Sequence, residues 1–243
     1  EAILIQLRAM YKSARKEFNE LVLPKIDYKR PLFKHQLEAI QLMSQHKHNL
    51  LAFSMGLGKT IVSATLSKVL DVKRTLIICP SGVKFNWYHD MCDEWGFDPM
   101  NWTILDARKS KCQYAFIEKF IVVNYENVLK HAIHLTKSEI GHIIIDEAHF
   151  LKNTTANRTK VVAGLIDKFP NARVTMLTGT PVTNRIDDMF SYYKMFKHIL
   201  GKNKTYFTQR YVRRTNGFRG KIIGAQNIDE LRVLHSNFII RKR

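Results

Sequence analysis

Two short polar segments carry residue types that together could transfer a phosphoryl group. The first, Gly56-Leu57-Gly58-Lys59-Thr60, follows one apolar run, and the second, Asp146-Glu147, follows another. Glycines at such a turn let backbone N–H groups point at an anion, while Lys59 can reach the β- and γ-phosphates and Thr60 can bind Mg²⁺. Asp146 is suited to holding Mg²⁺ through water, and Glu147 to orienting or deprotonating the attacking water. The two segments therefore predict a site for a triphosphate with its Mg²⁺.

Each segment has a simpler explanation when it is taken alone. The general phosphate-loop pattern has a glycine five residues before Gly58, where this chain has Phe53. The first segment could thus be a glycine-bearing helix start, and Asp146-Glu147 could be an acidic turn after a strand. A lysine loop and an acidic strand end supply both halves of one phosphoryl-transfer site, and this pairing favours the functional interpretation.

The elements that must position these residues alternate between strand and helix patterns. Strands are predicted at 50–53, 74–79, 102–105, 120–123, 142–145 and 173–177, and helices at 32–46, 61–70, 83–95, about 154–168 and 185–200. Such alternation predicts an α/β fold, a parallel sheet with helices on both faces. Both candidate loops then lie at carboxyl ends of strands, the edge at which such sheets bind ligands.

The composition indicates a polyanionic partner. The 243 residues include 39 Lys and Arg against 21 Asp and Glu, a formal charge of +18, and nucleic acid is the commonest partner for such an excess. No apolar run approaches the roughly 20 residues of a membrane span, and no signal segment opens the chain, so we expect a soluble, intracellular protein. Cys79, Cys92 and Cys112 have no CxxC spacing and are expected to be free thiols.

Three strings, in this order, resemble motifs I, II and III of helicase superfamily two: MGLGKT at 55–60, DEAHFLKN at 146–153 and LTGTP at 177–181. Within that superfamily the chain is most similar to the Swi/Snf-type ATPases, which translocate on double-stranded DNA. Gln36 in LFKHQLEAI resembles the adenine-reading Q motif, and the segment 77–95 resembles motif Ia. NYE at 124–126 and FIIRKR at 238–243 also fit, so the resemblance runs from about Arg30 to the end.

The resemblance implies a RecA-like P-loop lobe that uses ATP and Mg²⁺, and it implies a role for each matching residue. The implied catalytic residues are Lys59, Asp146 and Glu147. Thr60 and Asp146 are the implied ligands of Mg²⁺. The implied nucleotide contacts are Gln36, Met55, Gly56, Leu57, Gly58, Lys59 and Thr60. Coupling of nucleotide to DNA is implied for His149, Thr178, Gly179 and Thr180, and nucleic-acid contact for Ser81, Lys84, Asn86, Lys152 and Asn153. One departure is that Phe53 and Ser54 replace two acids that usually precede MGLGKT, which leaves the subfamily and the efficiency open.

The expected organisation is an N-terminal helix and basic connector at 1–30, followed by the lobe at 31–243. A mostly helical basic subdomain is expected at about 201–235, and its surface either contacts duplex phosphates or is simply solvated. No segment matches the family's second RecA-like lobe, which we expect in the same longer chain or in trans, so the isolated lobe should be nearly inactive. The partners expected are duplex DNA and that second lobe. The alternatives are an RNA helicase or restriction-type translocase lobe of the same superfamily, or a non-catalytic basic scaffold.

Overall fold

A sheet of seven strands organises the protein. The structure is a computed structural model that describes residues 28–106, 116–179, 186–215, 220–235 and 238–242. The strands run in the order β3-β4-β2-β5-β6-β1-β9, and every pairing between neighbours is parallel. Their bounds are β1 His48–Phe53, β2 Arg74–Cys79, β3 Trp102–Leu105, β4 Phe120–Asn124, β5 Ile140–Ile145, β6 Arg173–Leu177 and β9 Ile239–Lys242. The predicted parallel α/β sheet is confirmed.

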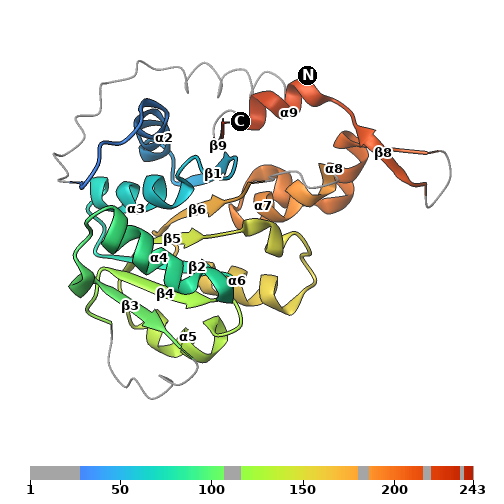
Figure 1. The fold of residues 1–243 in the computed structure, drawn as a ribbon. Coiled ribbons are helices and arrows are strands. Elements are labelled where there is room, and N and C mark those ends of the chain that lie inside the picture. Colours follow the sequence, from blue (N-terminus) through green and yellow to red (C-terminus); the bar gives the residue numbers. More distant parts are fainter. Residues whose placement is uncertain (1–27, 107–115, 180–185, 216–219, 236–237, 243) are drawn as a thin grey trace.

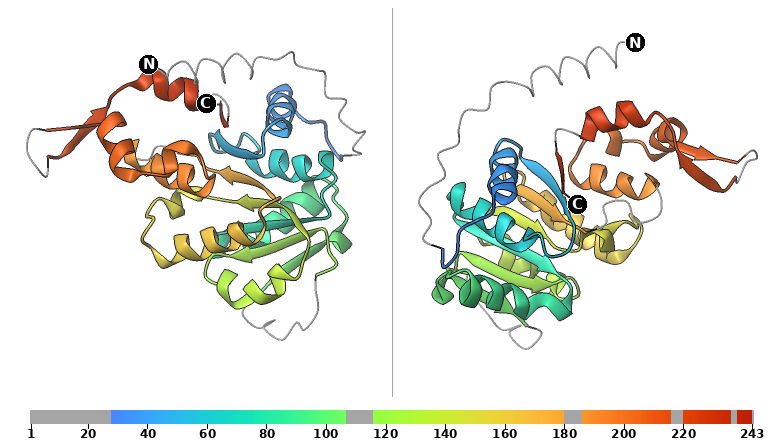
Figure 2. Two further views of the ribbon diagram at one scale, coloured as in Figure 1. Left: turned by 180° about the vertical axis from the view of Figure 1, so that it is seen from behind. Right: turned by 45° about the horizontal axis from the view of Figure 1, so that its top comes forward.

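Helices cover both faces of the sheet (Figures 1 and 2). One face is packed by α2 Lys34–Ser44, α3 Lys59–Val69 and α4 Lys84–His89. The other is packed by α5 Val128–Thr136, α6 Asn157–Lys168 and α7 Met189–Met195. Among the described residues, no helix has the length and apolar character that a membrane crossing requires.

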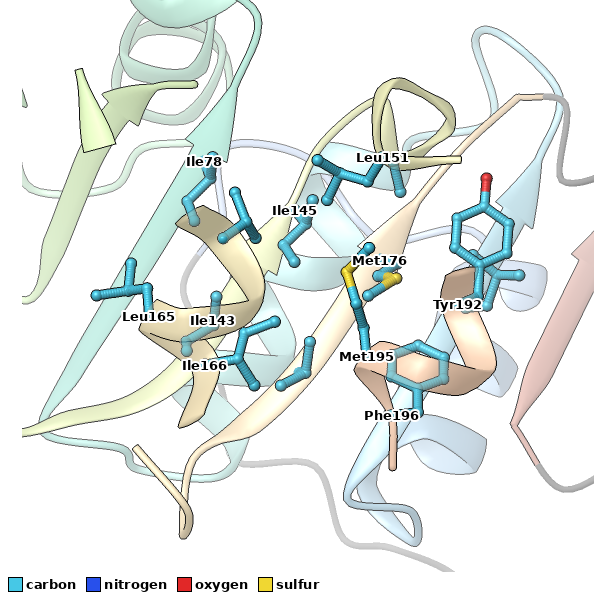
Figure 3. Packing of buried hydrophobic residues seen from close by; sticks show 14 of the residues in the cluster. Ile78, Ile143, Ile145, Leu151, Leu165, Ile166, Met176, Tyr192, Met195 and Phe196 are labelled. Atoms are coloured by element: carbon cyan, nitrogen blue, oxygen red, sulfur yellow. The ribbon is translucent and has the colours of Figure 1, made fainter. Parts of the chain in front are cut away.

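The central strands are apolar along their whole length because both of their faces are covered. On β5, Ile143 and Ile145 pack toward α6 and α7, while Ile144 between them packs into the opposite core. Figure 3 shows the first of these cores, in which Leu165 of α6 and Met195 of α7 lie near the β5 isoleucines. The isoleucine run that the sequence offered as a central strand is thus buried on both sides.

One histidine ties together the elements that carry the candidate site. His142 of β5 is fully buried, and its Nδ1 and Nε2 lie 2.7 Å from Ser67 Oγ on α3 and 2.8 Å from Thr175 Oγ1 on β6. Burial, reinforced by the charge of Arg173, lowers the pKa of His142 to about 3. The neutral imidazole therefore links three elements by hydrogen bonds that water does not weaken.

Two predicted helices are shorter than the apolar spacing indicated. The segment 83–95 is a 3₁₀ turn at Ser81–Val83, then α4, then a π-helical turn at Asp90–Glu94 closed by Trp95 N donating to the Asp90 carbonyl. The segment 185–200 contains α7 between 3₁₀ turns at Ile186–Asp188 and Ile199–Gly201. α7 ends near Lys197, whose φ of 54° is left-handed and cannot continue a helix. The predicted N-terminal helix at 1–23 lies outside the described residues.

The C-terminal quarter holds the least predictable elements. The subdomain expected at about 201–235 comprises helices α8 Lys204–Tyr211 and α9 Ile228–His235, with an unexpected antiparallel hairpin of β7 Val212–Arg214 and β8 Ile222–Ala225 between them. The terminal segment then returns to the sheet as β9, which pairs with β1. In Figure 1 the hairpin projects beyond the carboxyl ends of β5 and β6.

The buried His142 should make stability fall in mild acid. Its folded pKa is below the ordinary value of about 6.5, so the stability it contributes is complete above that pH. This stability is lost as the pH falls from about 6.5 toward 3, at up to roughly 1.4 kcal/mol per pH unit. Urea unfolding measured between about pH 7 and pH 5 should show a smaller pH dependence for His142→Asn than for the wild type.

His89 offers the matched control, because its side chain is 62% exposed. His89→Asn should keep the wild-type pH dependence. An unchanged pH dependence in His142→Asn would contradict the account.

Candidate nucleotide site

The glycine loop between β1 and α3 has a backbone that only glycine adopts easily. Gly56 and Gly58 have φ of 80° and 79°, in the left-handed region. A Cβ on Gly58 would lie 2.3 Å from Gln36 Nε2, so a side chain there would also collide with α2. Lys59 follows as the first residue of α3, and its Nζ donates to the carbonyls of Phe53 at 3.1 Å and Ser54 at 3.3 Å. The ammonium is therefore held over the loop by groups that an anionic ligand can replace.

The acidic loop is held by bonds to three neighbouring segments. Asp146 Oδ2 accepts a 2.9 Å bond from Trp87 Nε1 of α4, and Oδ1 accepts from Glu147 N at 2.8 Å. Its carbonyl accepts a 2.6 Å bond from the Tyr125 hydroxyl, and its N–H donates to Ile78 O at 2.8 Å. Both carboxylate oxygens are thus oriented by donors from fixed elements.

Electrostatics connects the two loops. Burial raises the pKa of Asp146, and the neighbouring Glu147 adds to this, whereas the Trp87 bond and the charge of Lys59 oppose it. The positive charge of Lys59 thus favours the ionised form of Asp146. Because β6 separates β1 from β5 in the sheet, the two strand ends are about 10 Å apart, two strand spacings.

Glu147 occupies a strained position. Its φ of 48° is left-handed, which is uncommon for a residue with a long side chain and is found most often where function requires it. Its Oε2 lies 3.0 Å from His149 Nδ1, and the His149 ring stacks on Phe150 with centroids 4.7 Å apart. The carboxylate thus lies beside His149, on the residue that follows the half-buried Asp146.

An arginine that the sequence did not single out braces the acidic loop. Arg158 of α6 places its guanidinium 5.2 Å from the Phe150 ring centroid and 5.5 Å from that of Tyr125. Its NH2 lies 3.5 Å from Glu126 Oε1. Arg158 therefore joins the loop after β4 to the loop after β5. No sequence pattern pointed to it, because two of its partners, Tyr125 and Glu126, lie on a different segment of the chain.

A cavity of about 640 Å³ adjoins the glycine loop. Gln36 lines it, accepting from Phe33 N at 3.0 Å and donating to Leu57 O at 3.4 Å. The amide is thus engaged with the loop backbone and keeps one N–H for a ligand. Of the other predicted nucleotide contacts, Met55 is 86% exposed at the tip of the loop, and Gly56, Gly58, Lys59 and Thr60 line the cavity.

The predicted coupling segment after β6 lies beside the glycine loop. Thr178 is buried, and its N–H donates to Leu51 O at 3.1 Å. Gly179 comes close to Phe53, since a Cβ there would lie 4.0 Å from the Phe53 carbonyl oxygen. Thr180 lies outside the described residues.

The predicted nucleic-acid contacts divide into exposed and buried residues. Ser81, Asn86, Lys152 and Asn153 are exposed. Lys84, which the resemblance placed among the nucleic-acid contacts, is instead only 6% exposed, with Nζ 4.0 Å from Asp106 Oδ1. The reason is that α4 begins at Lys84 after a 3₁₀ turn, which directs this residue toward the β3 end.

The oxygen atoms of Asp146 and Thr60 suit Mg²⁺ better than they suit a metal whose ligands all come from the protein. Among the described residues, no group of three or more His, Cys, Asp or Glu could hold a metal ion. Mg²⁺ in nucleotide sites needs only one or two carboxylates beside phosphate oxygens and water, which Asp146 and Thr60 can supply. Cys79 and Cys92 are free thiols as predicted, and Cys112 lies outside the described residues.

Comparisons with known proteins identify the family. A family model described as the SNF2-related domain matches residues 35–243. A Caenorhabditis elegans protein named as a homolog of SWI/SNF-related matrix-associated actin-dependent regulator of chromatin subfamily A-like protein 1 is 30% identical, over 95% of this chain and 34% of its own length. The DNA repair protein rhp54 of Schizosaccharomyces pombe is 27% identical, over 79% of this chain and 26% of its own length.

The fold matches that of a solved structure. The SWI2/SNF2 ATPase core of Sulfolobus solfataricus in complex with dsDNA aligns with a TM-score of 0.71 and 24% identity, over 91% of this chain and 46% of that one. The chain thus spans about a third or less of these curated relatives and about half of the solved core. The chain belongs to the SNF2-related family of ATPase domains, as the resemblance of its motifs to the Swi/Snf-type ATPases predicted.

Proposed function

We propose that the chain is the ATP-binding lobe of a DNA-dependent ATPase that translocates on duplex DNA to remodel or displace bound complexes. The observation that carries the proposal is the pairing of the Lys59 loop with the Asp146 loop across a gap of about 10 Å. A gap of that size accommodates a triphosphate and its Mg²⁺. The charge of Lys59 also acts to lower the pKa of Asp146, which supports the same arrangement.

Each side chain of the site has a separate task. Lys59 exchanges its bonds to the Phe53 and Ser54 carbonyls for bonds to β- and γ-phosphate oxygens, with little loss of hydrogen bonding. Thr60 and Asp146 would hold Mg²⁺, which would neutralise charge on the phosphates. Trp87 keeps the Asp146 carboxylate facing the ligand. Glu147, which follows Asp146 in a left-handed backbone conformation, orients the attacking water and accepts its proton.

Arg158 acts as a positioning residue for this machinery. Tyr125 holds the Asp146 backbone, and Phe150 packs on His149 beside Glu147. The Arg158 guanidinium lies over both of these rings, so it fixes the two loops relative to each other. Phe150 stacks on His149, so the Arg158 brace supports coupling through His149, while the resemblance of the motifs implies coupling for Thr178, Gly179 and Thr180.

Duplex DNA is the proposed track. The formal charge of +18 and the exposed Ser81, Asn86, Lys152 and Asn153 near the carboxyl edge of the sheet support phosphate contacts. Relatives named for chromatin regulation and DNA repair, and a structural match solved with dsDNA, favour duplex DNA over RNA. The intact Lys59, Thr60, Asp146 and Glu147 disfavour a non-catalytic scaffold.

Hydrolysis by the lobe alone should be slow. An arginine that stabilises the transferring phosphate is worth about 10³–10⁵ in turnover, and in this family it comes with the second lobe. The relatives are about three or more times as long as the match, which leaves room for such a lobe in a longer chain or in trans.

The hairpin subdomain supplies a second DNA-contacting surface in this proposal. We call residues 202–232 the basic arm. Five cations on it are exposed and form no ion pair among the described residues: Lys202, Lys204, Arg213, Arg214 and Lys221. Its two acids are already paired, Glu230 with Arg210 and Asp229 with Arg232. The arm projects on the side of the sheet where β5 and β6 end, which is also the side of the nucleotide site (Figure 1).

ATP binding and turnover, measured on the same 243-residue chain, test the proposal. We expect ATP binding with Mg²⁺ but slow turnover that duplex DNA barely raises. Lys59→Ala should weaken ATP binding by roughly 10- to 100-fold, because a hydrogen bond to a charged group is worth about 1.5–3 kcal/mol. The exposed Lys73, whose side chain is 61% exposed, provides the control Lys73→Ala, which should bind as the wild type does.

Two results would contradict this part of the account. Equal ATP affinities for Lys59→Ala and Lys73→Ala would remove Lys59 from the site. Rapid DNA-stimulated turnover by the chain would show that the second lobe is not needed.

The basic arm makes a second prediction, on salt dependence. Replacing Arg213, Arg214 and Lys221 by Gln should shallow the log–log salt dependence of duplex binding by up to about 2.7, since each phosphate contact contributes about 0.9. The matched control replaces three exposed lysines, Lys130 on α5, Lys137 directly after it and Lys168 on α6, by Gln with the same loss of charge. Fluorescence anisotropy with a labelled duplex measures the salt dependence of both variants. Equal changes would show that the basic arm acts only through the overall charge of the protein and does not contact the duplex.

A further inference from the structure

The cavity beside the glycine loop has two chemically different ends. Gly56, Gly58, Lys59 and Thr60 line one end, which is rich in backbone N–H groups and carries the lysine. Arg30, Phe33, Asp90, Glu94 and Trp95 line the other, so two carboxylates border a cavity proposed to hold a polyanion. Carboxylates repel phosphates, and their presence therefore needs an explanation in terms of a different part of the ligand.

The π-helical turn brings these acids to the cavity. After α4, the bond from Trp95 N to Asp90 O spans five residues instead of four. Asp90 and Glu94 line the cavity, whereas Asp93 between them faces away, with Oδ2 2.9 Å from His89 Nδ1. Single π-helical turns inside helices are rare and occur frequently at functional sites.

The carboxylates of Asp90 and Glu94 differ in whether they already have a partner in the protein. Glu94 Oε2 lies 3.3 Å from Arg30 NH2, and the Arg30 guanidinium lies 4.4 Å from the Trp95 ring centroid. Glu94, Arg30 and Trp95 thus contact one another at this end of the cavity. The Asp90 carboxylate has no ion pair or side-chain hydrogen bond among the described residues. Partial burial, and then the nearby Glu94, raise the pKa of Asp90, and the residue remains exposed and therefore accessible to a ligand.

We propose that Asp90 is a specificity-determining residue that accepts a hydrogen bond from the nucleoside part of the nucleotide. A nucleotide bound with its phosphates on Lys59 turns its nucleoside toward the acidic end. The donors available there are the exocyclic amine of adenine and the ribose hydroxyls, and both suit a carboxylate. The inference rests on the proposed function, and it adds a second reading point to Gln36, whose amide is largely occupied by the loop.

The test compares three ligands on the 243-residue chain by calorimetry or fluorescence: ATP, 2′-deoxy-ATP and purine riboside triphosphate, which lacks the exocyclic amine. Asp90→Asn has nearly the same shape as the wild type and should weaken ATP binding about tenfold. For the analogue that lacks the group bonded to Asp90, the Asp90→Asn variant and the wild type should have the same, weaker affinity. Asp93→Asn, on the same turn but facing His89, is the control and should bind all three ligands as the wild type does.

The pattern of losses identifies the partner group. If 2′-deoxy-ATP is the ligand insensitive to Asp90→Asn, the acid reads the ribose, and if purine riboside triphosphate is, it reads the base. Equal losses for all three ligands, no loss, or tighter binding by Asp90→Asn would overturn the inference. A wild-type chain that fails to bind ATP would instead overturn the proposed function, so the two failures are distinguishable.

Discussion

The parallel order of β5, β6 and β1 is the constraint on which the site depends. It places the ends of two strands about 10 Å apart, one leading into the Lys59 loop and the other into Asp146. His142 of β5 lies within hydrogen-bond distance of Ser67 on α3 and Thr175 on β6, so buried hydrogen bonds join the strand that leads into Asp146 to the helix that follows the Lys59 loop. This arrangement requires a neutral His142, so protonation of that imidazole lowers the stability of the fold.

The acidic loop shows how burial and ligand binding are balanced. Taking Asp146 out of water disfavours its charge, and the structure compensates with Trp87, the Glu147 N–H and the nearby Lys59. A carboxylate prepared in this way meets a cation with its hydrogen bonds already arranged. The strained backbone of Glu147 is maintained because Arg158 and its aromatic partners hold the neighbouring segments in place.

The sequence predicted what depends on local pattern and missed what depends on packing. The glycine loop, the isoleucine strand and the alternation of elements follow from short-range composition, and all are present. The π-helical turn at Asp90 breaks the 3.6-residue period, so the assumed periodicity hid the acids that face the cavity. Lys84 is buried because α4 begins at this residue after a 3₁₀ turn, which the assumed continuous helix did not include. The return of β9 to pair with β1, and Arg158 over Phe150, are contacts that no local pattern encodes.

The central claim is that Lys59 and Asp146 grip one triphosphate with its Mg²⁺, and the dependence of ATP affinity on Mg²⁺ tests it most directly. Asp146→Asn keeps the shape of the side chain and an oxygen that can accept from Trp87. The account predicts that this variant binds ATP like the wild type without Mg²⁺ but loses at least about tenfold of the gain that Mg²⁺ provides. An undiminished gain from Mg²⁺ in Asp146→Asn would contradict the account.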